Sequence, residues 1–348
     1  MAPVLSARAE KVARILKTRF DHDGRYFLDA YVGSGIQADV FRIKKHGSDI
    51  PGPDRVAVKV PAMPELRTAK SEMIPEKEAL RLFSGAMHVV QILDMRENVV
   101  GADPLSRDIK DAPMMPVSGW MYLEWLDNGT LHSFLQKARD VERPVPNRLL
   151  WRIFMCYIRM ITAMAWSKVH VSGTHQLEEI QSNIPDMIHF NSDMHSQNMV
   201  FGDFDPNSPH LEHRLSPMLK MIDLGYIARK KTANEAIWKH NVGELIWQVG
   251  NEMKTIVLAG ARISLEDKNL DSDLIKIVRW CEDPSSSKRP SLQDLHEWVG
   301  RAITGRDADW YKKEMPDPWA NSLEEDDAVR QYVVELIVNA STEEAKGP

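Results

Sequence analysis

Three polar side chains that could bind a metal ion or orient a hydroxyl group lie beside two short apolar runs. Asp193 and Asn198 precede the run 199–201, and Asp223 follows the run 219–222. Two such runs are typical of a β-hairpin, whose ends can bring these side chains together. Carboxylate and amide oxygens there could surround a divalent cation and phosphate oxygens, with one acid orienting a hydroxyl. Each segment alone is equally consistent with ordinary loop aspartates.

A lysine within an apolar strand is the second candidate. Lys59 follows Val56, Ala57 and Val58, so its ammonium must reach solvent or meet an anionic partner. The helical segment 72–83 offers Glu76 as this partner. Glu78, two residues further on, points elsewhere on that helix.

A glycine turn is the third candidate. Gly33 and Gly35 lie between two predicted strands, where backbone N–H groups could approach a phosphate without obstruction. The strand-turn-strand context argues against a dinucleotide-binding motif, which needs a strand-turn-helix. Ordinary hairpins also carry this Gly-x-Gly spacing.

The secondary structure expected around these residues changes along the chain, from a helix to strands and then to helices. Residues 7–19 predict a leading helix. Residues 25–60, 89–95 and 119–126 then predict five strands, with the one helix at 72–83 between them. Beyond residue 127 the pattern is mostly helical. Three polar stretches, 97–119, 168–187 and 202–217, are expected to be surface insertions.

The composition is typical of a globular protein and argues against some classes of binding protein. The 348 residues are 43% hydrophobic and 27% charged, typical of a globular chain with two packing units. A net charge of −6 argues against a general nucleic-acid or anionic-membrane binder. The N-terminal segment lacks a signal-peptide core and no run reaches roughly 18 apolar residues, so we expect an intracellular, cytoplasmic protein. Cys156 and Cys281 are expected to be buried, inert thiols.

The order of the motifs is more specific than any one of them. The glycine turn, Lys59, Glu76, Asp193, Asn198 and Asp223 follow one another as in the protein-kinase signature. From Arg25 to Ile303 the chain resembles the protein-kinase-like superfamily. The resemblance implies an α+β, bilobal fold: an N-lobe with a five-stranded antiparallel sheet plus one helix, a mainly helical C-lobe, and ATP in the cleft. The corresponding segments are a helical extension (1–24), the N-lobe (25–126), the C-lobe (127–305) and a C-terminal helical extension with a tail (306–348).

The resemblance also implies roles for individual residues. Lys59, held by Glu76, would contact the α- and β-phosphates of ATP, and Asp193 would orient the acceptor hydroxyl. Asn198 and Asp223 would hold Mg²⁺. The remaining ATP-binding positions would be Gly33, Gly35, Val40, Ala57 and the backbone at Glu124 and Leu126, beside Leu123. Arg289 matches the arginine of the late C-lobe.

Several positions depart from the family pattern. Ala38 replaces the third loop glycine, and Asn191-Ser192-Asp193 replaces His-Arg-Asp, which removes the arginine that receives an activation-loop phosphate. Only 20 residues separate Asp223 from Glu244, and Ala233-Asn234-Glu235 is a degenerate Ala-Pro-Glu.

Three functions remain open at this point. One is a kinase that phosphorylates Ser or Thr in a protein. Another is a phosphotransferase for a small hydroxylated acceptor, because Asp193, His195 and Asn198 resemble the catalytic loop of aminoglycoside and choline kinases. The last is a pseudokinase that serves as a binding scaffold.

Overall fold

The chain divides into two units, which we describe separately. The first contains residues 1–84 and 90–125, and the second contains residues 85–89 and 126–346. The computed structural model describes residues 6–35, 38–61, 67–93, 120–167, 175–259, 264–315 and 317–339. The expected insertion at 97–119 lies outside these ranges. Within them, no helix is both long enough and apolar enough to cross a membrane.

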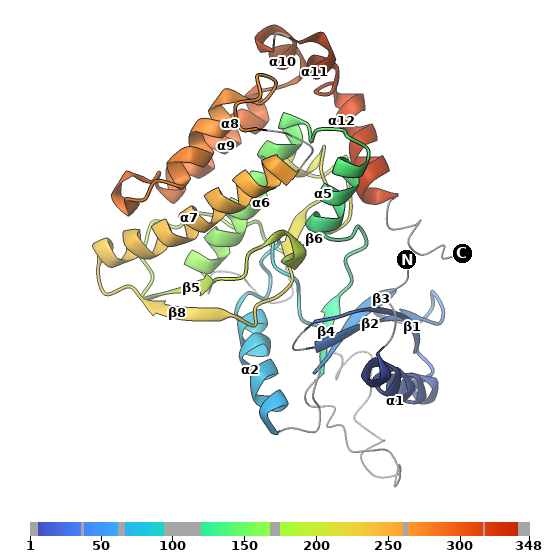
Figure 1. Cartoon of the computed structure of the whole chain (residues 1–348). Helices are drawn as coiled ribbons and strands as arrows, with labels where there is room; N and C mark the ends of the chain where they lie inside the picture. Colours follow the sequence, from blue (N-terminus) through green and yellow to red (C-terminus); the bar gives the residue numbers. More distant parts are fainter. Residues whose placement is uncertain are drawn as a thin grey trace. The chain divides into compact units, whose positions relative to one another are not determined.

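Unit 1 is an antiparallel sheet with two helices (Figure 1). Its strands are paired in the order β1-β2-β3-β4. In chain order the elements are α1 (Ala7–Asp23), β1 (Tyr26–Ser34), β2 (Ala38–Lys45), β3 (Arg55–Pro61), α2 (Arg67–Leu82) and β4 (Met121–Glu124).

The sheet has four strands among the described residues, and the expected total of five is wrong. In the described part of the segment predicted as a strand over 89–95, Ile92 forms a one-residue bridge with Leu123, and Val89 forms another with Met221 of unit 2. Two backbone hydrogen bonds, from Leu93 to Tyr122 and from Glu124 to Gln91, hold this segment beside β4. The apolar pattern therefore identified a segment that lies beside β4 at the edge of the sheet. Its regular backbone pairing with β4 is too short to form a strand.

Helix α1 covers one face of this sheet. Leu16 and Phe20 of α1 pack with Phe41 and Val58, which alternate in β2 and β3 with residues of the opposite face. The segment 1–24, expected as an extension, thus contributes a helix to the core of unit 1. The opposite face of β2 and β3 carries Lys59.

Unit 2 is mainly helical (Figure 1). Two short antiparallel pairs, β5 with β8 and β6 with β7, accompany the helices. Its elements are α5 (Leu131–Asp140), α6 (Asn147–Ala165), β5 (Met187–Asn191), η2 (Ser196–Asn198), β6 (Met199–Phe201), η3 (Leu211–His213), β7 (Leu219–Met221), β8 (Ile227–Lys231), α7 (Glu235–Ala259), α8 (Ser272–Cys281), η4 (Ser286–Lys288), α9 (Leu292–Gly305), α10 (Ala308–Glu314), α11 (Pro318–Ser322), α12 (Asp326–Val333) and a π-helical turn, η5 (Val334–Val338).

Helix α6 forms the centre of unit 2, since every one of its residues is buried. It packs against α7, α9, β5 and β7. Glu324, which follows α11, caps its first turn by accepting hydrogen bonds from the backbone N–H groups of Asn147 and Arg148. A carboxylate there also complements the positive end of the helix dipole. The segment expected as a C-terminal extension therefore completes the central helix.

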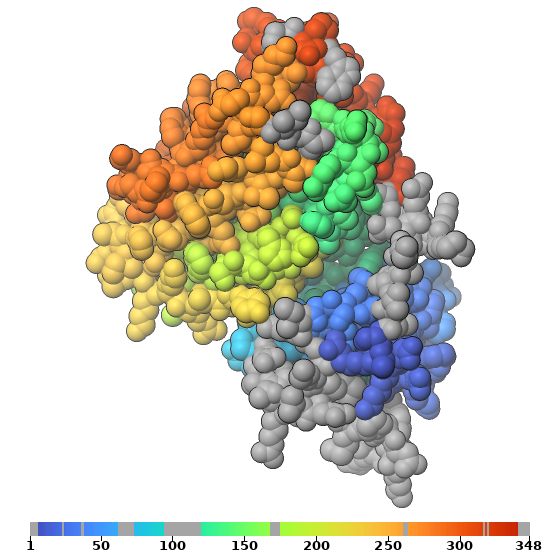
Figure 2. All heavy atoms as spheres, viewed as in Figure 1, coloured from blue at the N-terminus to red at the C-terminus, as the bar shows by residue number. Residues whose placement is uncertain are grey.

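Helices α7 and α8 lie side by side at the surface of unit 2 (Figure 2). Gly250 of α7 makes their close approach possible. A Cβ atom at this position would lie 2.6 Å from the Cβ of Cys281 in α8, closer than carbon atoms can pack.

Two polar segments expected as surface insertions carry buried charges. Within 202–217, Glu212 forms a two-point ion pair with Arg159 of α6, with both N–O distances at 3.0 Å. Within the described part of 168–187, Glu178 is fully buried and bonded to His88. The expectation that these segments lie only on the surface is wrong, because each supplies a carboxylate to the core.

Candidate functional site

The site residues of unit 1 centre on a buried ion pair. Lys59 Nζ on β3 lies 2.6 Å from Glu76 Oε1 on α2, and both side chains are less than a tenth exposed. Glu76 lies one helical turn before the buried Leu80, so the packing of α2 directs its carboxylate inward. The partner expected from the sequence is therefore the one that the structure pairs with Lys59.

The strand register places other predicted residues on the same face as Lys59. Gly33 is paired with Val40, Val40 with Lys59, and Lys59 with Met121. Directly paired residues in an antiparallel sheet point to the same side. Ala57, two residues before Lys59, shares this face. Gly33, Val40, Ala57 and Lys59 thus form one surface on the side of the sheet away from α1.

An arginine of α1 holds the glycine turn, which sequence reasoning missed. Arg8 binds both carboxylate oxygens of the fully buried Asp39 at 2.9 Å and donates to Ser34 Oγ at 2.8 Å. The Gly35 N–H donates to the carbonyl of Ala38 across the turn. An arginine near the N-terminus carries no sequence signal for this role, because its partners lie 26 and 31 residues away.

The two predicted adenine-contacting positions fall in different units. The N–H of Glu124, at the end of β4 in unit 1, donates to the carbonyl of Gln91, and the Glu124 carboxylate accepts from the Gln91 N–H. Leu126 begins the long segment of unit 2 and is half-buried.

The site residues of unit 2 lie on the loop between β5 and β6. Asn198 Nδ2 donates to the carboxylate of Asp193 at 2.9 Å and to its backbone carbonyl at 3.0 Å. His195 Nε2 lies 3.2 Å from the other carboxylate oxygen of Asp193. His195 Nδ1 also accepts a hydrogen bond from the N–H of Gln197 at 3.3 Å, so both ring nitrogens of His195 face polar groups of this loop. Because the amide nitrogen of Asn198 faces Asp193, its Oδ1 atom is the one oriented to accept or coordinate.

Asn191 connects this loop to Asp223. It is fully buried at the end of β5, its Nδ2 donates to the backbone carbonyl of Asp223 at 2.9 Å, and its Oδ1 accepts from the N–H of Asp193. A second link is the hydrogen bond from Ile222 N–H to the carbonyl of Asn198. The sequence marked Asn191 only as a departure from a family motif. Its position at the end of an apolar strand was the available signal for a structural role.

Strand β8 and helix α7 take up most of the segment after Asp223. β8 pairs along its whole length with β5, and α7 begins at Glu235, earlier than the expected start near Glu244. Asn234 caps α7 by accepting from the N–H of Ile237. Thr232 is buried, and its hydroxyl donates to the carbonyl of Pro185. Little irregular chain is left between the two elements.

Arg289 binds this helix at Gly243 and Glu244, within its third turn. Its Nη1 atom binds the carboxylate of Glu244 at 2.9 Å and the carbonyl of Gly243 at 2.8 Å. Its Nε atom donates to the carbonyl of Asp283. Arg289 therefore holds the chain before α9 against α7, which fixes the helix that follows β8.

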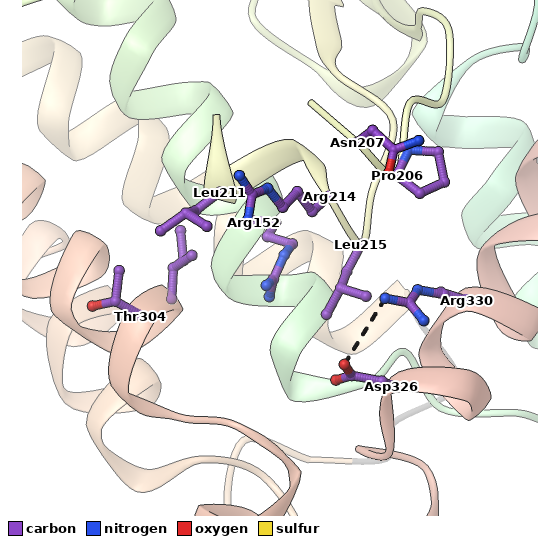
Figure 3. A pocket seen from close by; sticks show the side chains of 10 residues that line it. Arg152, Pro206, Asn207, Leu211, Arg214, Leu215, Thr304, Asp326 and Arg330 are labelled. Carbon is purple, nitrogen blue, oxygen red and sulfur yellow. Dashed lines mark ion pairs between the residues drawn. The ribbon is translucent and has the colours of Figure 1, made fainter. Parts of the chain in front are cut away.

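A cavity of about 570 Å³ in unit 2 is lined by none of the predicted site residues (Figure 3). The guanidinium groups of Arg152, Arg214 and Arg330 line it together with the Asp326 carboxylate. Burial lowers the pKa of Arg152 to about 10. The cavity is polar and cationic, and the sequence contained no motif for it.

Comparison of the chain with protein-family models and with curated protein sequences finds no match.

Proposed function

We propose that this protein is an ATP-dependent phosphotransferase with a protein-kinase-like fold, which transfers the γ-phosphate to a Ser or Thr hydroxyl of a protein. One observation carries the proposal. Unit 1 has a buried lysine-glutamate pair on the sheet face that carries the glycine turn, and unit 2 has an Asp-Asn pair bonded through Asn191 to a second aspartate. Unrelated loop residues have no reason to form these contacts in the order of the kinase signature.

The residues of unit 1 suit the binding of phosphate groups. Lys59 contributes a positive charge that Glu76 holds in one position, which limits the entropy lost when an anion binds. The glycine turn allows backbone N–H groups to approach phosphate oxygens, and Arg8 restrains this turn through Ser34. The face shared by Val40 and Ala57 is apolar and suits a flat base.

The residues of unit 2 suit the acceptor and a magnesium ion. Asp193 is partly exposed, so its carboxylate can accept a hydrogen bond from an acceptor hydroxyl and take its proton late in the transfer. Asn198 Oδ1 and the Asp223 carboxylate are hard oxygen donors of the kind Mg²⁺ prefers, and Asn191 holds the two segments together. When bound, Mg²⁺ would neutralise charge on the phosphate oxygens.

A small hydroxylated acceptor is the second candidate function. It is favoured by His195, which lies against Asp193, and by the direct pairing of β8 with β5. That pairing leaves little irregular chain after Asp223 to bind a peptide in extended form.

Incubation with labelled ATP and Mg²⁺ tests the proposal. The purified protein is assayed alone, with a generic protein acceptor, and with a panel of amino alcohols; Asp193→Asn serves as the inactive control. We expect label on protein in the wild type only. Label on a small molecule supports the second candidate. ATP binding without any transfer indicates a pseudokinase scaffold, and absence of binding contradicts all three functions.

A further inference from the structure

Two histidines and a cysteine meet in the interior of unit 2. His88 comes from the segment 85–89, Cys156 from α6 and His213 from η3. One potential ligand atom from each lies within 4.8 Å of the other two, and all three side chains are buried. The imidazole rings of His88 and His213 have their centroids 5.2 Å apart.

The cluster contains buried nitrogen atoms without hydrogen-bond partners. Among the described residues, no partner is found for Nε2 of His88 or for either ring nitrogen of His213. Buried polar groups in folded proteins are almost always satisfied, so three such atoms in one place call for a specific explanation. An ion bound between them provides one.

His88 is oriented as a metal-binding histidine usually is. Its Nδ1 atom lies 2.6 Å from Glu178 Oε2, and its backbone N–H donates to Glu178 Oε1 at 2.7 Å. A carboxylate on one ring nitrogen fixes the ring and leaves the other nitrogen for a ligand. For His88 that other nitrogen is Nε2, one of the atoms without a partner.

A carboxylate lies next to His213 but outside the cluster. Glu212 Oε1 is 3.6 Å from His213 Nε2, yet Glu212 is not among the residues whose ligand atoms lie within 4.8 Å of one another. Arg159 holds both oxygens of this carboxylate. Glu212 therefore serves as the counter-charge of Arg159, and the cluster supplies three protein ligands.

We propose that unit 2 contains a structural Zn²⁺ site in which Cys156 Sγ, His88 Nε2 and a ring nitrogen of His213 are three of the four ligands. Sulfur and imidazole donors select zinc over magnesium, whose ligands are oxygens. Binding replaces the proton of the Cys156 thiol, which passes to solvent. The ion joins α6 to the segments 85–89 and 202–217, and it is independent of the proposed phosphotransfer.

Burial of the cluster indicates a structural role. None of the three ligands is exposed enough to meet a substrate, and they come from three segments that are distant in sequence. The site is expected to raise the resistance of unit 2 to unfolding rather than to take part in chemistry.

Metal analysis of the full-length protein tests the proposal. The protein is produced without a histidine tag in zinc-supplemented medium and analysed by mass spectrometry of its metals. We expect about one zinc per chain in the wild type. Cys156→Ser should lose it, whereas Cys281→Ser, at the other buried cysteine, should keep it. Zinc-free wild-type protein, or equal loss in both variants, overturns the proposal.

Cobalt substitution covers the case in which Cys156→Ser fails to fold. Wild-type protein refolded with Co²⁺ should show the near-ultraviolet charge-transfer absorption of a cobalt-thiolate bond, together with tetrahedral visible bands. Cys281→Ser should give the same spectrum. Absence of the charge-transfer band in folded wild-type protein contradicts ligation by Cys156.

Discussion

The buried pair of Lys59 and Glu76 allows binding and stability to be separated by mutation. Lys59→Met alone leaves the Glu76 carboxylate, 2% exposed, without the ammonium that lies 2.6 Å from it. Breaking one side of a buried pair costs about 3–5 kcal/mol, because the remaining charge stays desolvated. Replacing both partners, as in Lys59→Met with Glu76→Leu, removes both charges and is expected to bring stability back to within about 1–2 kcal/mol of wild type.

Urea unfolding and Mg-ATP titration of these variants give the two readouts. Saturating ligand at about 100 times its dissociation constant stabilises a protein by about 2.7 kcal/mol. We expect this stabilisation in the wild type and none in the single or double variant. The matched control is Lys45→Met, because Lys45 pairs with Asp54, an exposed residue. This variant should keep both its unfolding midpoint and its response to ATP.

Two results would refute this reasoning. If the double variant is as unstable as Lys59→Met, the loss does not come from an uncompensated Glu76 charge. If the double variant still responds to Mg-ATP, Lys59 does not contact the nucleotide.

Four further predictions concern chemistry, regulation, packing and pH. Asp193→Asn should lower turnover by orders of magnitude at nearly unchanged ATP affinity, whereas Asp223→Asn should also weaken Mg²⁺-dependent ATP binding; near-normal turnover of Asp193→Asn contradicts its role. Thr232 is buried and its hydroxyl is hydrogen-bonded, so a kinase has no access to it in the folded protein. Thr232→Ala and phosphatase-treated protein should therefore keep turnover within about tenfold of untreated wild type, a change in the activation barrier of under about 1.4 kcal/mol. A larger loss points to a regulatory phosphate. Gly250→Ala should lower the melting temperature by forcing α7 from α8, while Gly243→Ala, whose added Cβ meets Ser286 at an ordinary 3.5 Å, should lower it less; equal effects refute the packing argument. Burial raises the pKa of Glu252 from its usual 4.5 to about 7. Between these two values the unfolded chain loses the proton more readily than the folded protein does, so the free energy of unfolding falls as pH rises from about 4.5 to about 7. Glu252→Gln should therefore raise the melting temperature at about pH 8 and leave it unchanged at about pH 4, and a uniform shift would show that its ionisation is not responsible.

Local patterns were sufficient for the elements that carry the candidate site. Periodicity identified α1 and α2, and two apolar runs identified the β6-β7 hairpin, because such patterns report which face of a helix or strand is buried. The same rule selected Glu76 over Glu78 as the partner of Lys59, since Glu76 lies one turn from Leu80. The order of the polar motifs predicted which loop residues belong together.

Local sequence patterns failed to predict structure where contacts between distant residues decide whether a segment forms a strand or is buried. Residues 89–95 have a strand-like pattern, yet strand formation depends on how many partners β4 offers, and β4 is four residues long. Residues 202–217 are polar on average, but Glu212 is buried because Arg159 needs a counter-charge inside unit 2.

By itself, the sequence determined the periodic elements, the residue types of the candidate site and their order, because each depends on neighbours within a few positions. Only the tertiary structure decided that Arg8 holds the glycine turn through Ser34 and that Asn191 links Asp193 to Asp223. It also brought together His88, Cys156 and His213. These contacts join residues tens of positions apart, and no spacing rule predicts them, because they depend on how the packed helices and strands place distant segments side by side.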